Sequence, residues 1–237
     1  LVAGLLHACV RAQCSSIFSG PPGSGKTTLL SCTAAQIDPA LRVVVAEEVL
    51  ETEVPLPNVA HVQTRPARAD RPAVDLRRLV SGFLRMAPDV AIVGEVRDRE
   101  ALPLLLTLSS GVMGMTTIHA GSARQALSRL RFICQLAETT GHVPMEALNT
   151  LVSENIDLVV QCARTPAGPR VVEVAAVEDP VGGPQATQYT MTRLFSRTGP
   201  DEPLSWTGEV PARLSQRLAD AGYDVVALLG ASEPGRW

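Results

Sequence analysis

The 237-residue chain is poor in aromatic side chains, which make up 3% of its residues, and its formal net charge is −3 at pH 7. Proteins that bind nucleic acid through their overall charge are basic, and those that bind single strands use aromatic rings as stacking platforms. Both properties are lacking here, which disfavours a general nucleic-acid-binding protein. Hydrophobic residues nevertheless make up 46% of the chain, which is ample for the core of one large α/β domain.

The sequence also lacks any C-x-x-C pair of cysteines. Its five cysteines are Cys9, Cys14, Cys32, Cys134 and Cys162. Closely paired cysteines are the usual sequence sign of a structural zinc site, so no zinc site is expected. Most of these cysteines lie in apolar segments, which indicates reduced, buried thiols in a cytosolic protein.

We expect no signal peptide in this sequence. An uncharged stretch at residues 101–118 is long enough to raise the question of a membrane span. Pro103, Gly111 and Gly114 interrupt it, so we predict a helix, a turn and a strand there, and a soluble protein. The chain begins at Leu1 rather than Met, with residues that already resemble a packed helix, so we expect a fragment that lacks upstream sequence.

One glycine-rich stretch matches the pattern G-x-x-x-x-G-K-[ST]. It reads Gly20-Pro21-Pro22-Gly23-Ser24-Gly25-Lys26-Thr27-Thr28. An apolar run at residues 16–19 precedes it and a predicted helix at 28–36 follows, which is the strand-loop-helix context of a phosphate-binding loop. In such a loop, backbone N–H groups and the positive end of the helix bind phosphate oxygens. Lys26 is expected to reach the β- and γ-phosphates, Thr27 to ligate Mg²⁺, and Thr28 to lie near the α-phosphate.

Predicted strands alternate with predicted helices, the pattern of an α/β domain with a mostly parallel central sheet and helices on both faces. Strands are expected at residues 16–19, 42–46, 59–63, 90–93, 113–118, 156–161 and 171–177. Helices are expected at residues 3–13, 28–36, 75–87, 122–137 and 144–152, and another opens at Asp98 or Arg99. Beyond residue 180 the chain becomes rich in Pro and Gly. We therefore predict a core at residues 1–180 and a small C-terminal extension at 181–237, with a short strand at 187–195 and a short helix at 211–221.

Polar side chains follow three of the predicted strands, where parallel-sheet proteins bind their ligands. They are Glu47 with Glu48, Gly94 with Glu95, and His119. Hydrolysis of a phosphoanhydride needs a carboxylate for the attacking water, a second near Mg²⁺, and a group that senses the γ-phosphate. Each residue alone is more often a solvated or structural side chain. Their joint position behind a phosphate loop favours a hydrolase. Because glycine precedes Glu95 where many phosphate-loop ATPases carry Asp, the metal-side role would fall to Glu95, through water.

The run LRMAPDVAIVGEVRD at residues 84–98 resembles the signature of the secretion ATPase superfamily, whose members power type II secretion, type IV pili and type IV secretion. The four boxes of that family appear in order. They are the Walker A loop at 20–27, the acidic box at 46–51, the Walker B Gly-Glu at 94–95 and the His box at 116–120. The resemblance implies a RecA-like phosphate-loop NTPase domain.

Within the superfamily the chain is most similar to the tight-adherence (Flp) pilus assembly ATPases. The residues that carry this similarity are QTRP at 63–66, SARQALSRL at 122–130, LF at 194–195 and TG at 198–199. The lack of paired C-x-x-C motifs argues against the zinc-bearing type II secretion branch.

The resemblance assigns roles to matching residues. Glu47 is expected to act as the general base, Glu95 as the Walker B glutamate, and His119 as the residue that couples the γ-phosphate to conformation. Arg97 matches the arginine that follows Gly-Glu in the family. Arginines at family positions near the nucleotide or a subunit boundary are Arg65, Arg77 and Arg85. One departure is Glu48, where the family usually has Asp, and we expect the upstream domain that closes over the nucleotide in the family to be missing from this fragment.

The resemblance thus implies an ATP- and Mg²⁺-dependent ATPase motor, a homohexamer at the cytoplasmic face of a bacterial inner membrane. Its partners would be membrane platform proteins of a pilus or secretion system, with no direct nucleic-acid contact. One alternative is a DNA translocase or helicase, which predicts a basic strand channel and stimulation by DNA. Others are a nucleotide-binding subunit without turnover and a small-molecule phosphotransferase, although no sequence signal for a lid or an acceptor pocket supports the last.

Overall fold

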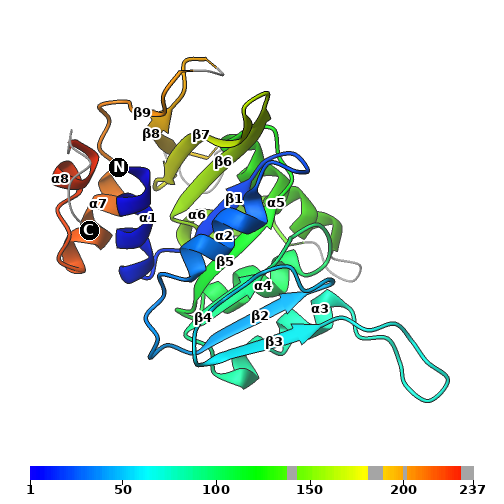
Figure 1. Ribbon diagram of the computed structural model, residues 1–237. Helices are drawn as coiled ribbons and strands as arrows, with labels where there is room; N and C mark the ends of the chain where they lie inside the picture. The colour runs from blue at the N-terminus through cyan, green and yellow to red at the C-terminus, as the bar shows by residue number, and fades with distance from the viewer. Residues whose placement is uncertain (138–142, 181–188, 200–201, 231–237) are drawn as a thin grey trace.

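The computed structural model describes residues 1–137, 143–180, 189–199 and 202–230, which form one twisted sheet between two layers of helices (Figure 1). Within these residues the sheet has the strand order β3-β2-β4-β5-β1-β6-β7-β8-β9. The strands are β1 Ser16–Ser19, β2 Val43–Glu47, β3 Val59–Gln63, β4 Val90–Val93, β5 Met113–Ile118, β6 Leu158–Thr165, β7 Gly168–Val177, β8 Met191–Ser196 and β9 Ser205–Trp206. The helices are α1 Val2–Arg11, α2 Lys26–Ala34, α3 Leu76–Ser81, α4 Ala101–Leu108, α5 Ala123–Ala137, α6 Met145–Asn155, α7 Ala212–Asp220 and α8 Val225–Gly230.

The strands from β3 to β6 in this order pair in parallel, whereas β7, β8 and β9 are added antiparallel. Parallel strands covered on both faces are apolar on both faces, and every residue of β1, β2, β4 and β5 is buried. The prediction of a mostly parallel sheet is therefore confirmed.

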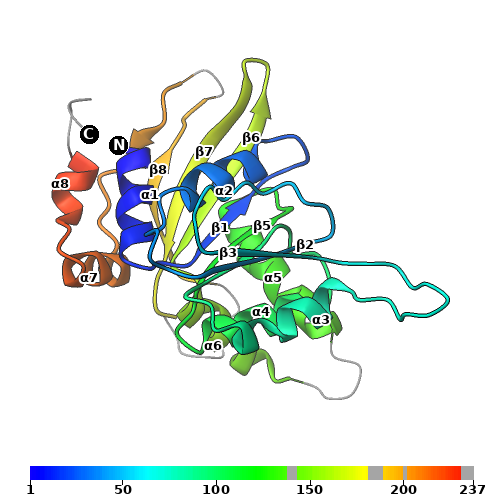
Figure 2. The same cartoon turned by 60° about the horizontal axis from the view of Figure 1, so that its bottom comes forward.

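Each face of the sheet is covered by its own set of helices. On one face α1, α2, α7 and α8 pack over residues such as Phe18 and Val45. On the other, α3, α4, α5 and α6 pack over Ile17 and Val44, and Figure 2 shows this second layer below the sheet. Neighbouring residues of one strand point to opposite faces, so each strand contributes to both halves of the core.

The helix predicted at residues 75–87 is interrupted, and the prediction of one continuous helix is wrong. α3 ends at Ser81, Gly82 follows, and a 3₁₀ helix runs over Phe83–Met86. Glycine is a poor residue for a helix interior, and a residue that precedes proline disfavours the right-handed helical conformation. Ala87, which precedes Pro88, indeed has a positive φ of 48°.

The described residues of the C-terminal region hold one more strand and one more helix than predicted. β8 and α7 lie close to the expected positions, and β9 and α8 are the additions. Both additions are too short to produce a clear periodic pattern. The division of the chain at residue 180 remains a prediction, and residues 181–188 lie outside the described part. Leu194 and Leu214 from this region are buried in the same cluster as α1.

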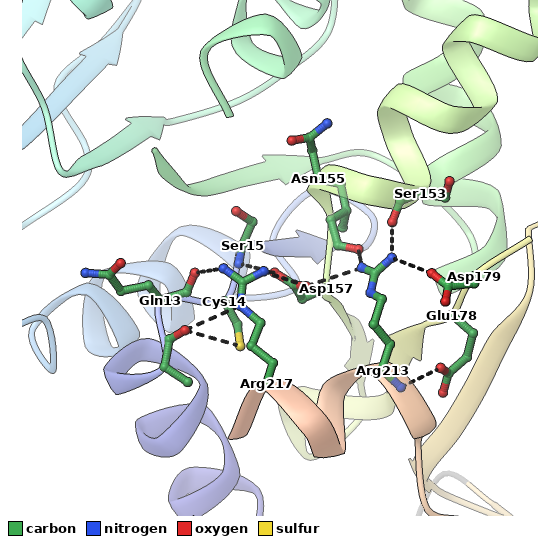
Figure 3. Close-up of polar contacts among 12 residues, drawn as sticks. Gln13, Cys14, Ser15, Ser153, Asn155, Asp157, Glu178, Asp179, Arg213 and Arg217 are labelled. Atoms are coloured by element: carbon green, nitrogen blue, oxygen red, sulfur yellow. Dashed lines mark hydrogen bonds and ion pairs between the residues drawn. The ribbon is translucent and has the colours of Figure 1, made fainter. Parts of the chain in front are cut away.

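A buried carboxylate ties α7 to the start of two central strands (Figure 3). Asp157, 3% exposed, accepts a hydrogen bond of 2.8 Å from the Ser15 backbone N–H. Arg213 and Arg217 of α7 form ion pairs with Asp157 at 3.2 and 3.1 Å. Arg217 also donates to the carbonyl oxygen of Gln13 at 2.6 Å. The C-terminal region is thereby attached to the core by charge as well as by apolar packing.

In the described ranges, no helix has both the length and the apolar character that crossing a membrane requires. The uncharged stretch at residues 101–118 folds as α4, a turn and β5, as predicted.

Replacing Asp157 with Asn should lower the free energy of unfolding by about 2–4 kcal/mol, because it leaves two arginines without their buried partner. Glu173→Gln is the matched control, since Glu173 pairs at 3.0 Å with Arg193, whose side chain is mostly exposed. Exposed pairs contribute about 0–1 kcal/mol. Urea unfolding followed by circular dichroism measures both variants, and equal losses would contradict the role given to Asp157.

Candidate functional site

The phosphate loop lies between the end of β1 and the start of α2, and its glycines are required by its shape. Gly25, directly before α2, has a φ of +84°, which favours glycine. Gly20 lies against β6, since a Cβ at that position would be 2.4 Å from the carbonyl oxygen of Cys162. The Ser24 hydroxyl donates to the Pro21 carbonyl at 2.8 Å and closes the turn. The loop is therefore curled with its backbone next to the first turn of α2.

Lys26 is the only lysine in the sequence, and its side chain folds back over the loop. Its Nζ donates to the carbonyl oxygen of Pro21 at 3.0 Å and lies 3.4 Å from Nδ1 of His119. Burial lowers the pKa of Lys26, and the negative charge of Glu95 partly opposes this shift. The only lysine of the chain is thus held at the position where a phosphate group would bind.

Glu47 ends β2 with a buried carboxylate, 3% exposed, of which only one oxygen is used. Its Oε1 accepts hydrogen bonds from the backbone N–H of Thr52 at 3.0 Å and from the Thr52 hydroxyl at 2.5 Å. In the part of the chain that the structure describes, its Oε2 has no hydrogen-bond partner. A buried charged oxygen without a partner is costly, so it indicates a place for a water or a ligand.

Gly94 follows β4 and lies directly against Glu47. A Cβ at Gly94 would be 2.6 Å from Oε1 of Glu47 and 2.8 Å from its Cγ. Any side chain at this position, including the Asp of many phosphate-loop ATPases, would therefore displace the buried carboxylate. This contact is the physical reason for the glycine that precedes Glu95.

Glu95 and His119 connect the ends of β4 and β5. Nε2 of His119 lies 2.7 Å from Oε1 of Glu95, and its Nδ1 lies 3.2 Å from the carbonyl oxygen of Gly20. Since Nδ1 is also near Lys26, a continuous line of polar contacts runs from Glu95 through His119 to the phosphate loop. A change in the position or charge of one of these groups can therefore affect the others.

Arg97 lies at the rim of the site and forms an ion pair with Glu48. The hydrogen bond and the charge of Glu48 raise the pKa of Arg97 further above its ordinary value. The Arg97 side chain is 54% exposed, so this pair lies in contact with solvent. Its backbone N–H donates to the Glu100 carboxylate at 2.6 Å, which fixes the turn after Glu95.

One cavity of about 330 Å³ brings these predicted residues together. It is lined by Lys26, Thr27, Glu47, Glu95, Arg97 and His119, among others. Thr28 is exposed and is not part of its lining, and the predicted arginines Arg65, Arg77 and Arg85 do not line it either. Arg65 lies on an exposed hairpin and pairs through its backbone with Val74.

Sequence reasoning missed two features of the site. Thr52, which holds Glu47, belongs to no motif, and only its distance of five residues from the acid links the two. The pairing of Glu48 with Arg97 was missed as well, because residues at the ends of different strands meet only in the folded sheet. Glu51, the last residue of the acidic box, also lines the cavity.

The protein side chains at the site offer few metal ligands. Over the described ranges, no group of three or more His, Cys, Asp or Glu side chains is placed to hold a metal ion. Mg²⁺ usually keeps several waters and uses one or two protein oxygens together with substrate phosphates. The Thr27 hydroxyl and the Glu95 carboxylate, both lining the cavity, fit a Mg²⁺ ion bound in this way.

A glycine loop between β1 and α2, with acidic and imidazole side chains at the ends of neighbouring parallel strands, is the arrangement of a phosphate-loop NTPase with a RecA-like fold. The comparisons with known proteins agree. Residues 2–194 match the family described as "Type II/IV secretion system protein", and the chain belongs to that family.

Two curated relatives show where the similarity lies. The conjugal transfer protein TrbB of Rhizobium radiobacter is 33% identical over 180 residues, which are 74% of this chain and 52% of TrbB. The type IV secretion system protein PtlH of Bordetella pertussis is 35% identical over 162 residues, 67% of this chain and 48% of PtlH. The chain thus spans about half the length of these relatives. The assignment to the Flp branch remains a prediction.

Solved structures share the fold. The VirB11 ATPase of the Brucella suis type IV secretion system, solved in complex with sulphate, has a TM-score of 0.66 and 28% identity, over 73% of this chain and 51% of that one. The ATPase DotB of Legionella pneumophila has a TM-score of 0.54 over 98% of this chain and 54% of its own. At 19% identity, DotB supports the fold alone.

Gly94→Ala should lower the free energy of unfolding by about 1–3 kcal/mol, because the added methyl group overlaps the carboxylate of Glu47. Gly230→Ala is the control, since a Cβ there would lie 3.8 Å from Trp206, an ordinary contact. The control should be neutral or slightly stabilising in a helix. Urea unfolding tests both variants, and a neutral Gly94→Ala would contradict the close contact with Glu47.

Lys26 should lose its proton at a lower pH than an exposed lysine, whose pKa is about 10.4, because burial penalises the charged amine. With one lysine in the sequence, ¹³C-lysine labelling gives a single side-chain resonance whose pH titration measures this pKa directly. The urea-unfolded chain is the reference. A folded-state midpoint at or above the unfolded one would contradict the burial of Lys26.

Proposed function

We propose that the chain is the ATP-hydrolysing core of a motor that powers protein secretion or pilus assembly. The observation that carries this proposal is the carboxylate of Glu47. It is buried, one of its oxygens is fixed by Thr52, and the other has no partner in the described structure while the side chain lines the cavity beside the phosphate loop. That arrangement suits a general base that accepts a proton from an attacking water.

The phosphate loop would bind the nucleotide. Backbone N–H groups of residues 23–27, at the end of the loop and the start of α2, would present partial positive charge to phosphate oxygens, and Lys26 would add a full charge. Thr27 and Glu95 would hold Mg²⁺, the latter through water. When bound, the ion neutralises charge on the β- and γ-phosphates.

Hydrolysis would then depend on three strand ends. Glu47 orients a water and takes its proton through Oε2, the oxygen that Thr52 leaves free. His119 lies between Glu95 and Lys26. Binding of a γ-phosphate by Lys26 would therefore change the contacts of His119, and this change would reach Glu95 at the end of β4. Arg97, exposed and paired with Glu48, would exchange that carboxylate for a phosphoryl oxygen.

For the whole protein we propose a homohexamer that works at the inner face of the bacterial cytoplasmic membrane with platform proteins of a secretion or pilus system. The support is the family of the chain and the names of its relatives, which are secretion and conjugal transfer proteins. The Flp pilus system is the particular system that the sequence resemblance favours.

Lys26→Ala should abolish ATP turnover and strongly weaken nucleotide binding, because the loop loses its only side-chain cation. Glu47→Gln should retain ATP binding and lose about 10²–10⁴-fold in turnover, because the amide cannot accept a proton. Glu173→Gln, remote from the cavity, should behave as the parent. Turnover is measured by phosphate release in Mg²⁺, and binding by calorimetry.

Sustained turnover by Lys26→Ala would exclude the proposed site. Turnover by Glu47→Gln at the parent's rate would remove Glu47 from the role of base. A parent that binds ATP without turning it over would support a nucleotide-binding subunit instead.

A further inference from the structure

The phosphate loop has a second cationic neighbour, on β6. A Cβ at Gly23 would lie 3.6 Å from Nη1 of Arg164, so the guanidinium lies beside the open side of Gly23 in the loop. Arg164 is exposed, and across the described residues it has neither an ion pair nor a hydrogen-bond partner. An unpaired guanidinium beside a phosphate loop is in a position to bind an anion.

β6 is held firmly against the loop just before Arg164. The Ser19 hydroxyl at the end of β1 donates to Oε1 of Gln161 at 2.5 Å, and Nε2 of Gln161 donates to the carbonyl oxygen of Ala120 at 3.1 Å. The pairing of β6 with β7 shifts register between Gln161 and Cys162. Such a bulge changes the direction of the side chains that follow it. Arg164 therefore projects from a strand whose position relative to the loop is fixed.

The turn after Arg164 also rests on the loop. Pro169 of β7 would lie 3.1 Å from a Cβ at Gly25, and the Thr165 hydroxyl donates to the Gly168 carbonyl at 2.8 Å to close the turn. The β6–β7 hairpin and the phosphate loop thus form one packed unit, which limits the movement of the Arg164 backbone.

Carboxylates outnumber the lysine and arginine side chains in the lining of the cavity. Four carboxylates line it, those of Glu47, Glu48, Glu51 and Glu95. Lys26 and Arg97 are its lysine and arginine, and Arg97 is already paired with Glu48. A polyphosphate adds more negative charge to this set. Arg164 is the nearby guanidinium that no carboxylate of the described chain neutralises.

We propose that Arg164 binds the nucleotide in the same chain, at the phosphates that ATP and ADP share. Glu47, Glu95 and His119 lie at the ends of β2, β4 and β5, on one side of β1, and they mark the γ-phosphate end of the site. β6 is on the opposite side of β1, so Arg164 approaches the α- and β-phosphates. This inference depends on the proposed nucleotide-binding function.

The test compares the dissociation constants of ATP and ADP for the 237-residue chain and its variants, in Mg²⁺ at constant ionic strength. Arg164→Ala should weaken ATP and ADP by a similar factor of roughly ten or more, since it removes a charge-assisted hydrogen bond. Arg164→Lys should lose less, because it keeps the charge but not the planar fork. Arg170→Ala, an exposed arginine on the same hairpin, is the matched control and should stay within about twofold of the parent.

Each other outcome overturns a definite statement. Unchanged binding by Arg164→Ala, or an equal loss with Arg170→Ala, would overturn the inference and leave the proposed function intact. A loss confined to ATP would overturn the assignment to the shared phosphates. If the parent binds neither nucleotide, the proposed function and the inference fail together. Urea unfolding of every variant separates loss of binding from loss of folding.

Discussion

The contact between the Glu47 carboxylate and the backbone at Gly94 determines the architecture of the site. It requires that two neighbouring parallel strands end at the same level and that one of them carries no side chain there. With this space filled by Glu47, the role proposed beside the metal falls to Glu95 one residue later, and Glu95 in turn contacts His119. The glycine is therefore as much a part of the proposed chemistry as the acids around it.

The sequence was sufficient for the parts of the fold whose signals are local. The glycine loop, the buried strands and the polar residues at their ends all follow from pattern and spacing, and they meet in one cavity as expected. The hydroxyl that fixes Glu47, the pairing of Arg97 with Glu48, and the approach of Arg164 to Gly23 are contacts between residues that no pattern joins. They could not be predicted, because only the packing of the sheet brings them together.

Local conformation explains the remaining differences. The predicted helix at residues 75–87 had the right apolar spacing, but two local features outweigh that spacing. Gly82 divides the helix, and the Ala87-Pro88 step ends it. β9 and α8 were missed because segments of two and six residues carry too little pattern. In the first case the backbone geometry at one or two positions decided the outcome, and in the second the length of the segment did.

β6 is anchored at both ends to different parts of the molecule. Directly before its start, Asp157 is clamped by the arginines of α7, and toward its other end Gln161 and Arg164 lie against the phosphate loop. The single eight-residue strand β6 therefore joins the contact with α7 to the contact with the phosphate loop. In mechanical terms, β6 is the structural link between the position of α7 and the position of the phosphate loop.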